Sequence, residues 1–320
     1  MTKIAIIGAG FAGLTIAKLL EHKAQITIFE KSRGIGGRIA TRYADRWEFD
    51  HGSPFLTAKT PEFKDFLNPL IHSGIVAKWS PKIVSENMKE VNLDSQYFVG
   101  VPKINSIGKY LARDLDTRLE TKIVKLEKIS SKWKLTDDKF QEYYEYDFVI
   151  TATPSLQALE ILPSNCFYAE YITKVEMLPT FAVMLGFDDD VMQSKNWDVM
   201  NLQNSKIDKI IANHNKPFRE INPSFVVHAR RDWSKENIDA NKYEVAENII
   251  SELENVFNKK INPSITQVHR WLYAKAEPHG LAESFFIDKE NNLISCGDWC
   301  IGGNVEDAFK SGSKVASYII

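Results

Sequence analysis

The stretch KIAIIGAGFAGLTIAKLLEHKAQITIFEK, residues 3–31, decides the fold. It opens with a short apolar run, Lys3–Gly8, and continues with a segment of helical apolar spacing, Phe11–His22. An alternating run, Gln25–Glu30, follows. This order predicts a β-strand, an α-helix and a second, parallel β-strand.

A G-x-G-x-x-G motif, Gly8 to Gly13, lies where the first strand passes into the helix. Gly8 allows the tight turn, Gly10 lets the backbone approach a pyrophosphate, and Gly13 brings the helix against the strand. Phe11 and Ala12 then supply backbone N–H groups at the positive end of the helix dipole. The motif therefore predicts dinucleotide binding.

Glu30 ends the second strand 22 residues after Gly8, where a carboxylate can accept hydrogen bonds from ribose hydroxyls. A carboxylate at this place repels a 2′-phosphate, which argues against NADP at this site. The segment Lys31–Arg38 then brings together three cations and three glycines, among them Gly36 and Gly37. Backbone that can wrap a second phosphate edge, with Arg38 to neutralise it, favours a long cofactor such as FAD over NAD.

Length, charge and cysteine content exclude several classes of protein. The chain has 320 residues, long enough for two domains, and its formal charge of −2 gives no field that would attract nucleic acid or an anionic membrane. Only three cysteines are present, and no apolar run is long enough to span a membrane. We predict a cytoplasmic protein without a disulfide framework or a metal site.

The rest of the chain alternates between two kinds of pattern. Helices are predicted near 61–71, 107–115, 243–257 and 304–320, a hairpin at 122–135, and strands at 146–151, 180–187, 224–229, 268–274 and 293–297. The last strand and helix resemble the opening strand and helix more than their neighbours. We therefore predict an α/β fold (α+β overall) with a discontinuous Rossmann-like domain of residues 1–75, 102–165 and 285–320. Residues 76–101 and 166–284 are predicted to form an inserted, mainly antiparallel substrate domain.

Several longer motifs resemble a known family, the flavin-containing amine oxidase superfamily, and within it the bacterial renalase-type branch. They are Glu30–Arg38, Ala40-Thr41-Arg42, Phe49-Asp50-His51-Gly52, residues 269–274 (HRWLYA) and residues 296–308 (CGDWCIGGNVEDA). The resemblance implies the fold of the p-hydroxybenzoate hydroxylase/amine oxidase type with FAD as cofactor. Because no cysteine lies in a context typical of a flavin bond, we expect the FAD to be bound non-covalently.

The resemblance also implies which residues hold the FAD. Asp298 is expected at the ribityl and pyrophosphate region, and the helix that starts at Asn304 and Val305 is expected to point at the isoalloxazine. Gly302 and Gly303 before it are expected to leave backbone N–H groups free, which would stabilise negative charge on the reduced flavin. The other implied contacts come from the hairpin, from the strand that ends near 151, and from the segment after Arg38: Ile123, Val124, Thr151, Ala152, Ala40, Thr41, His51, Gly52 and Ser53.

This chain departs from the family pattern at two places. Pro154 follows Ala152-Thr153 where a glycine is usual, and Ser53-Pro54-Phe55 replaces a polar and aromatic pair. The second departure bears on the shape of the pocket and leaves the flavin site intact.

Aromatic and basic residues alternate along two predicted strands, so that each set shares one face. These candidate substrate-pocket residues are His228, Arg230 and Trp233 near the first strand, and His269, Trp271 and Tyr273 on the second. A cation among several aromatic rings suits a planar, anionic or phosphate-bearing substrate.

The renalase-type likeness implies oxidation of dihydronicotinamide isomers, reduced at ring positions 2 or 6, to NAD(P)+. The flavin N5 would take the hydride, and dioxygen would accept the electrons to give hydrogen peroxide. Two alternatives stay open. One is a true amine oxidase, for which Lys275 is the candidate lysine, and the other is a non-catalytic or redox-partner FAD-binding protein. The expected partners are therefore a small-molecule substrate and dioxygen, without nucleic acid or membrane.

Overall fold

The computed structural model describes residues 1–91, 95–192, 194–219, 222–281 and 283–320. The chain forms two compact units. Unit 1 consists of Met1–Arg38, Gly108–Met177 and Lys275–Ile320, and unit 2 of Ile39–Ile107 and Leu178–Ala274. Each unit is thus built from segments that lie far apart in the sequence.

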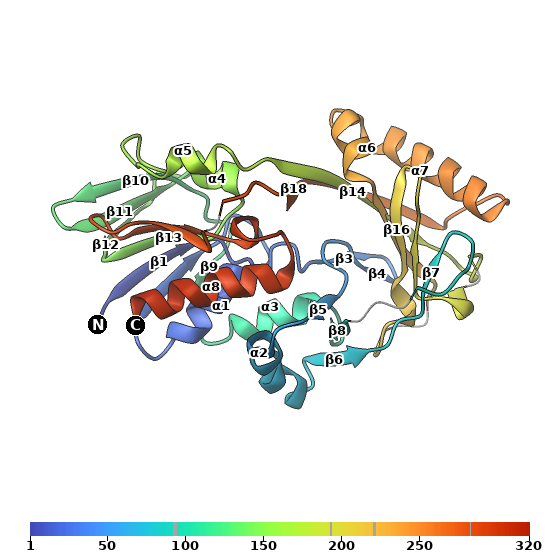
Figure 1. Cartoon of the computed structure of the whole chain (residues 1–320), viewed down its shortest axis with the longest axis horizontal. Helices are drawn as coiled ribbons and strands as arrows, with labels where there is room; N and C mark the ends of the chain where they lie inside the picture. The colour runs from blue at the N-terminus through green and yellow to red at the C-terminus, as the bar shows by residue number, and fades with distance from the viewer. Residues whose placement is uncertain (92–94, 193, 220–221, 282) are drawn as a thin grey trace. The chain divides into compact units, whose positions relative to one another are not determined.

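Unit 1 contains a six-stranded sheet with the order β19-β20-β13-β1-β2-β9. Figure 1 labels β1, β9 and β13 of this sheet. All neighbouring strands run parallel except β19, which is antiparallel to β20. The strands are β1 (Lys3–Ile7), β2 (Gln25–Phe29), β9 (Asp116–Arg118), β13 (Phe148–Thr151), β19 (Phe285–Asp288) and β20 (Leu293–Cys296). The predicted Rossmann-like sheet is therefore confirmed.

Two helices of unit 1 pack against each other, α1 (Phe11–Leu20) and α8 (Val305–Ile319). Gly312 permits the close approach, since a Cβ there would lie 2.7 Å from the carbonyl oxygen of Ala12. The remaining elements are a three-stranded antiparallel sheet, β10 (Ile123–Ile129), β11 (Lys132–Asp137) and β12 (Glu142–Tyr146), with the short helices α4 (Ser155–Leu159) and α5 (Ala169–Ile172). The predicted hairpin and C-terminal helix are thus present.

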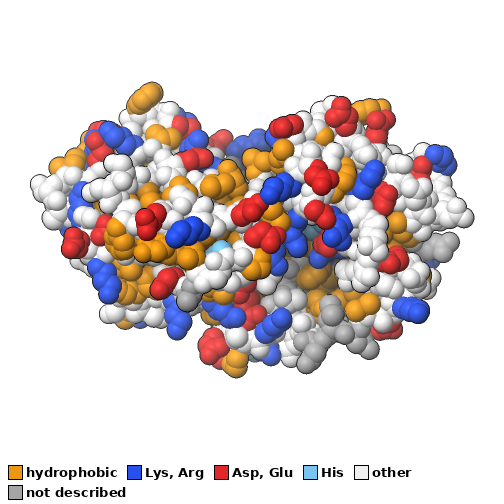
Figure 2. Space-filling view, turned by 45° about the horizontal axis from the view of Figure 1, so that its top comes forward, with side chains coloured by type: hydrophobic (Ala, Val, Ile, Leu, Met, Phe, Trp, Pro, Cys, Tyr) orange, Lys and Arg blue, Asp and Glu red, His pale blue; other side chains and the backbone are white. Residues whose placement is uncertain are grey.

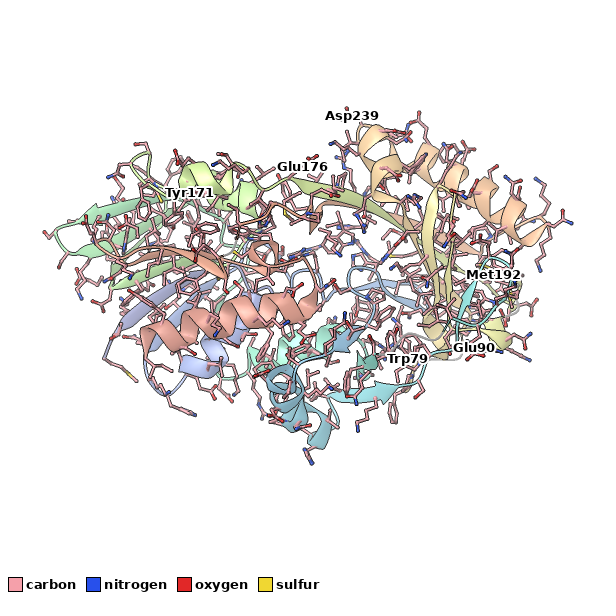
Figure 3. The ribbon with its side chains drawn as sticks, viewed as in Figure 1. Trp79, Glu90, Tyr171, Glu176, Met192 and Asp239 are labelled. Atoms are coloured by element: carbon pink, nitrogen blue, oxygen red, sulfur yellow. The ribbon has the colours of Figure 1, made fainter. Side chains whose placement is uncertain are left out.

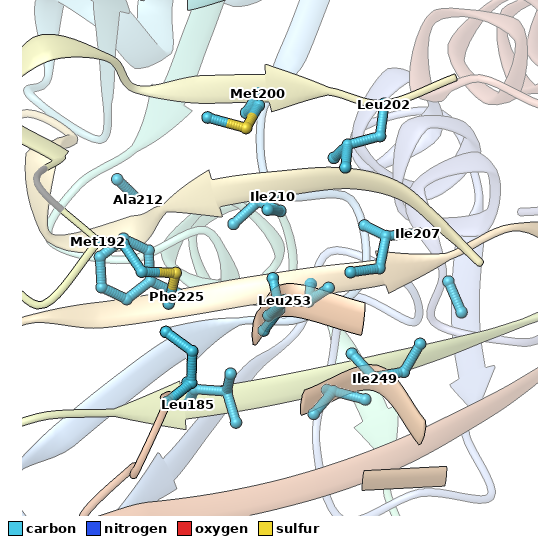
Figure 4. Close-up of a cluster of buried hydrophobic side chains, with 14 of the residues drawn as sticks. Leu185, Met192, Met200, Leu202, Ile207, Ile210, Ala212, Phe225, Ile249 and Leu253 are labelled. Carbon is cyan, nitrogen blue, oxygen red and sulfur yellow. The ribbon is translucent and has the colours of Figure 1, made fainter. Parts of the chain in front are cut away.

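Unit 2 contains a second six-stranded sheet, of order β18-β14-β17-β16-β15-β7. Its strands are β7 (Ile83–Ser85), β14 (Met177–Gly186), β15 (Val199–Asn201), β16 (Ile207–Ala212), β17 (Ser224–Ala229) and β18 (Ile265–Ala276). The pairs β14–β17, β16–β17 and β15–β16 are antiparallel, as predicted, whereas β7 runs parallel to β15. Helix α7 (Lys242–Phe257) contributes Ile249 and Leu253 to the core on one face of this sheet (Figure 4).

A second core lies in unit 2 and involves the chain that follows Arg38. Trp47 and Phe49 of β4 (Trp47–Asp50) and Trp79 of β6 (Val76–Trp79), labelled in Figure 3, pack with Met184 and Val226 of the large sheet. The other elements here are β3 (Thr41–Ala44), β5 (Leu56–Ala58), β8 (Gln96–Gly100) and the helices α2 (Pro61–His72) and α6 (Arg231–Glu236). Helix α3 (Asn105–Leu111) begins in unit 2 and ends in unit 1.

The contact-based units differ from the predicted domain boundaries in four segments. Residues 39–75 and 102–107 lie in unit 2, while 166–177 and 275–284 lie in unit 1. The first difference follows from the burial of Trp47 and Phe49 in the unit 2 core. The assignment of cofactor and substrate to the two parts stays a prediction.

The surface bears charges of both signs. On the face shown in Figure 2, acidic and basic side chains stand among one another. Among the described residues, no helix combines the length and apolar character needed to cross a bilayer.

Candidate functional site

The loop between β1 and α1 has the geometry of an anion cradle. Gly8 has a φ of +108°, and a Cβ there would lie 2.8 Å from the Ala152 carbonyl oxygen. A Cβ on Gly13 would lie 2.2 Å from the Gly8 carbonyl oxygen, so both positions require glycine. Around Gly10, by contrast, nothing lies within 4 Å of a Cβ.

The start of α1 is left open as well. Gly10 is its N-cap, it makes no side-chain cap, and the first turn contains no acidic residue. The first N–H groups of a helix have no partner within it, which makes this start suited to a phosphate. The space at Gly10 therefore fits the pyrophosphate of a dinucleotide.

Glu30 is buried at the end of β2 and held by backbone on both sides. Its carboxylate accepts hydrogen bonds from the N–H groups of Ala9 and Ser32, each at 2.8 Å. A carboxylate has about four acceptor positions, so two remain for ribose hydroxyls. The neighbouring Lys31 is exposed.

The Gly36-Gly37 segment lies directly on the cradle. The Gly36 N–H donates to the Ala9 carbonyl at 2.9 Å. A Cβ on Gly37, whose φ is +56°, would lie 3.2 Å from the Cα of Gly10. The cradle loop and the Gly36-Gly37 segment thus bring backbone close together at the edge where a second phosphate contact was predicted.

Arg38 and Asp298, both predicted to bind the cofactor, bind each other. Two hydrogen bonds join the guanidinium to the carboxylate, one of them at 2.8 Å. Asp298 is buried and is the first residue of the 3-10 turn Asp298–Cys300. Because the ion pair neutralises the buried carboxylate, Arg38 also positions Asp298.

The expectation that Gly302 and Gly303 leave free N–H groups is wrong. Both donate to the Asp298 carbonyl oxygen at 3.0 Å, and the Asn304 N–H donates to the Asp307 carboxylate at 3.0 Å. The chain turns tightly after Asp298, which brings these amides back to its carbonyl. The Asn304 side chain caps the Asp307 N–H, so a donor at this end of α8 is expected from the first helical residue, Val305.

The predicted adenine contacts lie at an irregular point of the small sheet. The β10–β11 register shifts between Ile123 and Lys125, which leaves Val124 outside the ladder. A bulge frees the backbone of the extra residue for other partners. On β13, the Thr151 hydroxyl lies 2.7 Å from that of Ser295, and the Ala152 N–H donates to the Ile7 carbonyl at 2.8 Å.

Five further residues predicted for the cofactor, Ala40, Thr41, His51, Gly52 and Ser53, lie in unit 2. The His51 N–H donates to the Ala40 carbonyl at 3.1 Å, and the Thr41 hydroxyl donates to the Asp50 carboxylate at 2.8 Å. These bonds fix the β3–β4 hairpin at the point where His51 leaves it.

Around His51, unit 2 brings together three of the predicted substrate residues, and we call this set the imidazole–indole cluster: His51, His228, His269 and Trp271. The His51 ring stacks on Trp271 at 5.2 Å and meets His269 edge-on at 4.9 Å between ring centroids. The His269 and Trp271 rings are 4.2 Å apart. The alternation along β18 thus places both rings on one face, as predicted.

Hydrogen bonds define the tautomers of the cluster. The His51 carbonyl oxygen accepts from the Trp271 indole N–H at 3.0 Å and lies 3.3 Å from Nε2 of His228. Because a carbonyl only accepts, His228 carries its proton on Nε2 in this bond. Arg42 only donates, so its contact with Nδ1 of His269 at 3.4 Å requires that nitrogen to be unprotonated.

The three imidazoles are neutral over the physiological range. Burial is the main cause in each case, and it lowers the pKa of His51 to about 3 and those of His228 and His269 to about 4. Neighbouring positive charge adds to this effect, from Arg42 and Lys242 at His269 and from Lys209 at His228.

A buried ion cluster supports the residue before His51. The Asp50 carboxylate accepts from Lys216 at 3.0 Å, from Arg219 at 2.6 Å and from the Ile104 N–H at 3.1 Å. Burial alone would raise the pKa of Asp50, but the two cations outweigh it and lower it to about 2. Burial lowers the pKa of Lys216 to about 8. Lys216 and Arg219 carry no sequence motif, so their role could not be predicted.

The other predicted substrate residues have structural partners. Arg230 is the N-cap of α6, beyond the end of β17, and its guanidinium pairs with Asp232 at 3.2 Å on an exposed surface. Trp233 packs against Phe181 at the unit 2 core. Tyr273 is half-buried on β18. Arg42, quoted in the sequence only as part of a motif, is the cation in contact with the cluster.

Comparison with family models finds two matches. Residues 6–70 match the NAD(P)-binding Rossmann-like domain, and residues 93–320, more than half of the chain, match the flavin containing amine oxidoreductase family. Among curated proteins, 4,4'-diapophytoene desaturase (4,4'-diaponeurosporene-forming) of Staphylococcus aureus strain Newman is 39% identical over 64 residues. That stretch is 20% of this chain and 12% of the desaturase.

Solved structures are similar along nearly the whole chain. A protein of Exiguobacterium sp. 255-15, described as a candidate protoporphyrinogen oxidase, has a TM-score of 0.80 at 13% identity, covering 99% of this chain and 98% of its own. A putrescine oxidase bound to putrescine has a TM-score of 0.73 at 11% identity, with the same coverage. At these identities the likeness shows the fold.

Proposed function

Because this chain belongs to the family of flavin-containing amine oxidoreductases, and is therefore an FAD-dependent oxidoreductase, we propose that it oxidises dihydronicotinamide nucleotides reduced at ring position 2 or 6. The products are NAD(P)+ and hydrogen peroxide, formed with one proton from water. FAD, when bound, supplies the hydride acceptor and passes the electron pair to dioxygen.

The observation that carries this proposal is the imidazole–indole cluster, in which the rings of His51, His269 and Trp271 lie 4.2 to 5.2 Å apart. With pKa values of about 3 to 4, His51, His228 and His269 are weak bases. Hydride loss from a dihydropyridine gives an aromatic pyridinium without removal of a proton. A set of weakly basic, flat rings therefore suits this substrate, since positioning alone is required.

The chain's own residues would hold the FAD in unit 1 without a covalent bond. The cradle at Gly10 and the start of α1 suit the pyrophosphate, Glu30 suits the adenosine ribose, and the α8 start at Val305 offers N–H groups. Cys166, Cys296 and Cys300 are all buried, and burial raises the pKa of Cys296 to about 12. None of the three thus favours attachment of a flavin.

Anaerobic mixing of the FAD-loaded protein with 6-dihydroNAD tests the proposal. We expect rapid loss of the visible flavin absorbance, its return on admission of air, and one equivalent of hydrogen peroxide. Ordinary 4-dihydroNAD and simple amines serve as controls and should leave the absorbance in place. Bleaching by amines alone would refute the proposal, as would a flavin that no dihydronicotinamide isomer reduces.

One observation in unit 1 favours amine oxidation as the second candidate. A Cβ on Gly303 would lie 2.8 Å from Cγ and 3.4 Å from Cε of Lys275, so this lysine lies against the loop before α8. A lysine near the flavin is common in amine oxidases. If this candidate holds, Lys275→Met abolishes flavin reduction by amines, whereas under our proposal the reduction by 6-dihydroNAD persists in the variant.

A further inference from the structure

Arg42 is a half-buried cation that has no carboxylate partner among the residues the structure describes. Its contact is with Nδ1 of His269, a neutral acceptor that cannot balance its charge. The other arginine of the same hairpin has an acidic partner. Arg46, in the same hairpin, pairs with Asp188 and stacks over Trp47. Arg42 is therefore held in place by the cluster while its charge stays available.

The surroundings of Arg42 add positive charge and flat rings. Lys242 lies near His269, and Lys209 lies near His228, where Asp208 pairs with Lys209 at 3.2 Å and opposes its charge. Trp271 and His51 stack beside His269. Nδ1 of His51 is buried and makes no hydrogen bond of good geometry with the described residues. Cation, stacked rings and an unsatisfied ring nitrogen thus meet in one place.

We propose that Arg42 is the anion-binding residue of this cluster, and that it binds an oxyanion carried by a planar heteroaromatic substrate. Guanidinium groups bind carboxylates and phosphates by paired N–H donors, and the imidazole contact orients that donor face. Trp271 and the imidazoles provide the surface against which the ring of the substrate packs. Arg230 was predicted for this role from the sequence, but Asp232 already neutralises it.

This inference rests on the proposed function for its substrate class, but binding tests it without turnover. Two ligand pairs differ by one anionic group each: nicotinate against nicotinamide, and nicotinamide mononucleotide against nicotinamide riboside. Calorimetric titration of the FAD-loaded protein should show about tenfold tighter binding for the anionic member of at least one pair. The first pair reports a ring carboxylate and the second a phosphate. Equal binding within both pairs overturns the proposal.

Variants locate the effect. Arg42→Gln should abolish the preference, Arg42→Lys should keep part of it, and the matched control Arg46→Gln should keep all of it. An undiminished preference in Arg42→Gln also overturns the proposal. If Arg42→Gln does not fold, the wild-type pairs and Arg42→Lys still decide. The proposed function fails separately: a preference without oxidation of 6-dihydroNAD refutes the reaction and leaves the anion site.

Discussion

At the scale of single residues, the imidazole–indole cluster links burial to charge. His269 accepts from Arg42 a bond that only the neutral ring can make, and burial disfavours the cations of His51 and His228. In the unfolded chain the same rings take up protons near pH 6.5. Protonation therefore favours unfolding, and the cluster makes stability depend on pH.

We predict that the protein loses stability between pH 7.5 and pH 5.5. The folded pKa values of about 3 to 4 lie below the unfolded value, so the unfolded state binds more protons as the pH falls. Each ring then costs about 1.4 kcal/mol over this range. Above pH 7.5 both states are unprotonated at these rings, and their contribution is complete.

Urea unfolding at several pH values measures this loss. His228→Asn should reduce the dependence of the unfolding free energy on pH by about a third, whereas His22→Asn, at an exposed position, should leave this dependence unchanged. The titration of Asp50 does not interfere with this measurement. Its pKa of about 2 confines the stability lost on protonation of Asp50 to below about pH 4. A slope that His228→Asn leaves intact would show that other groups cause the pH dependence.

Arg230 and Arg42 show how far the role of a single residue can be predicted from the sequence. The pattern of His228 and Arg230 predicts that both share a face of one strand, and this would hold if the strand continued. β17 ends at Ala229, so Arg230 turns into the start of α6 and pairs with Asp232. Arg42 reaches His269 across 227 positions of sequence. Such long-range pairing leaves no local signal.

At the scale of elements, Gly13 and Gly10 of the β1–α1 connection differ in whether packing requires a glycine. Gly13 lets the helix lie against the Gly8 carbonyl, which is a demand of packing. Gly10 has an ordinary φ of −75° and open space around its Cβ position, so packing does not require it. We propose that the space at Gly10 serves a ligand that the backbone approaches closely.

This contrast predicts opposite outcomes for two alanine variants. Gly10→Ala should keep the unfolding midpoint of the apoprotein within about 1 kcal/mol of wild type, because no atom is displaced. It should weaken FAD binding at least tenfold, since the methyl group occupies the cradle. Gly13→Ala should destabilise the apoprotein by about 2 kcal/mol or more, because its Cβ would overlap the Gly8 carbonyl. Thermal unfolding without FAD and fluorescence titration with FAD measure the two effects. Tight FAD binding by Gly10→Ala would contradict our assignment of the cradle.

The elements that the sequence predicts are the long or strongly patterned ones. Residues 3–31, α7 and α8 follow clear periods, and the structure confirms them. Strands of three residues, such as β5, β7 and β15, are too short to show a period of two. Residues 39–75 belong to unit 2 because Trp47 and Phe49 pack in its core, and no local sequence pattern indicates this tertiary packing.

At the scale of the whole molecule, unit 1 contains the residues that we predict to hold the cofactor, in the β1–α1 cradle, at Glu30 and at the α8 start, although they come from both ends of the chain. α1 and α8 pack on each other, and Arg38 binds Asp298 across 260 positions. A ligand held by both ends of the chain must bind the folded state and not the unfolded chain. Cofactor binding is therefore coupled to folding.

We predict that FAD stabilises the protein by mass action and leaves it on unfolding. At a free FAD concentration of 100 times the Kd, the gain is about 2.7 kcal/mol, and the unfolding midpoint rises steadily with the logarithm of that concentration. Ultrafiltration after denaturation should recover all flavin in the filtrate, since buried thiols such as Cys296, whose pKa is about 12, form no flavin bond. AMP is the matched control, because it offers the adenosine end to Glu30 without the pyrophosphate that spans the cradle, and it should stabilise far less. Flavin retained on the denatured chain, or a midpoint that ignores free FAD, would refute non-covalent binding in unit 1.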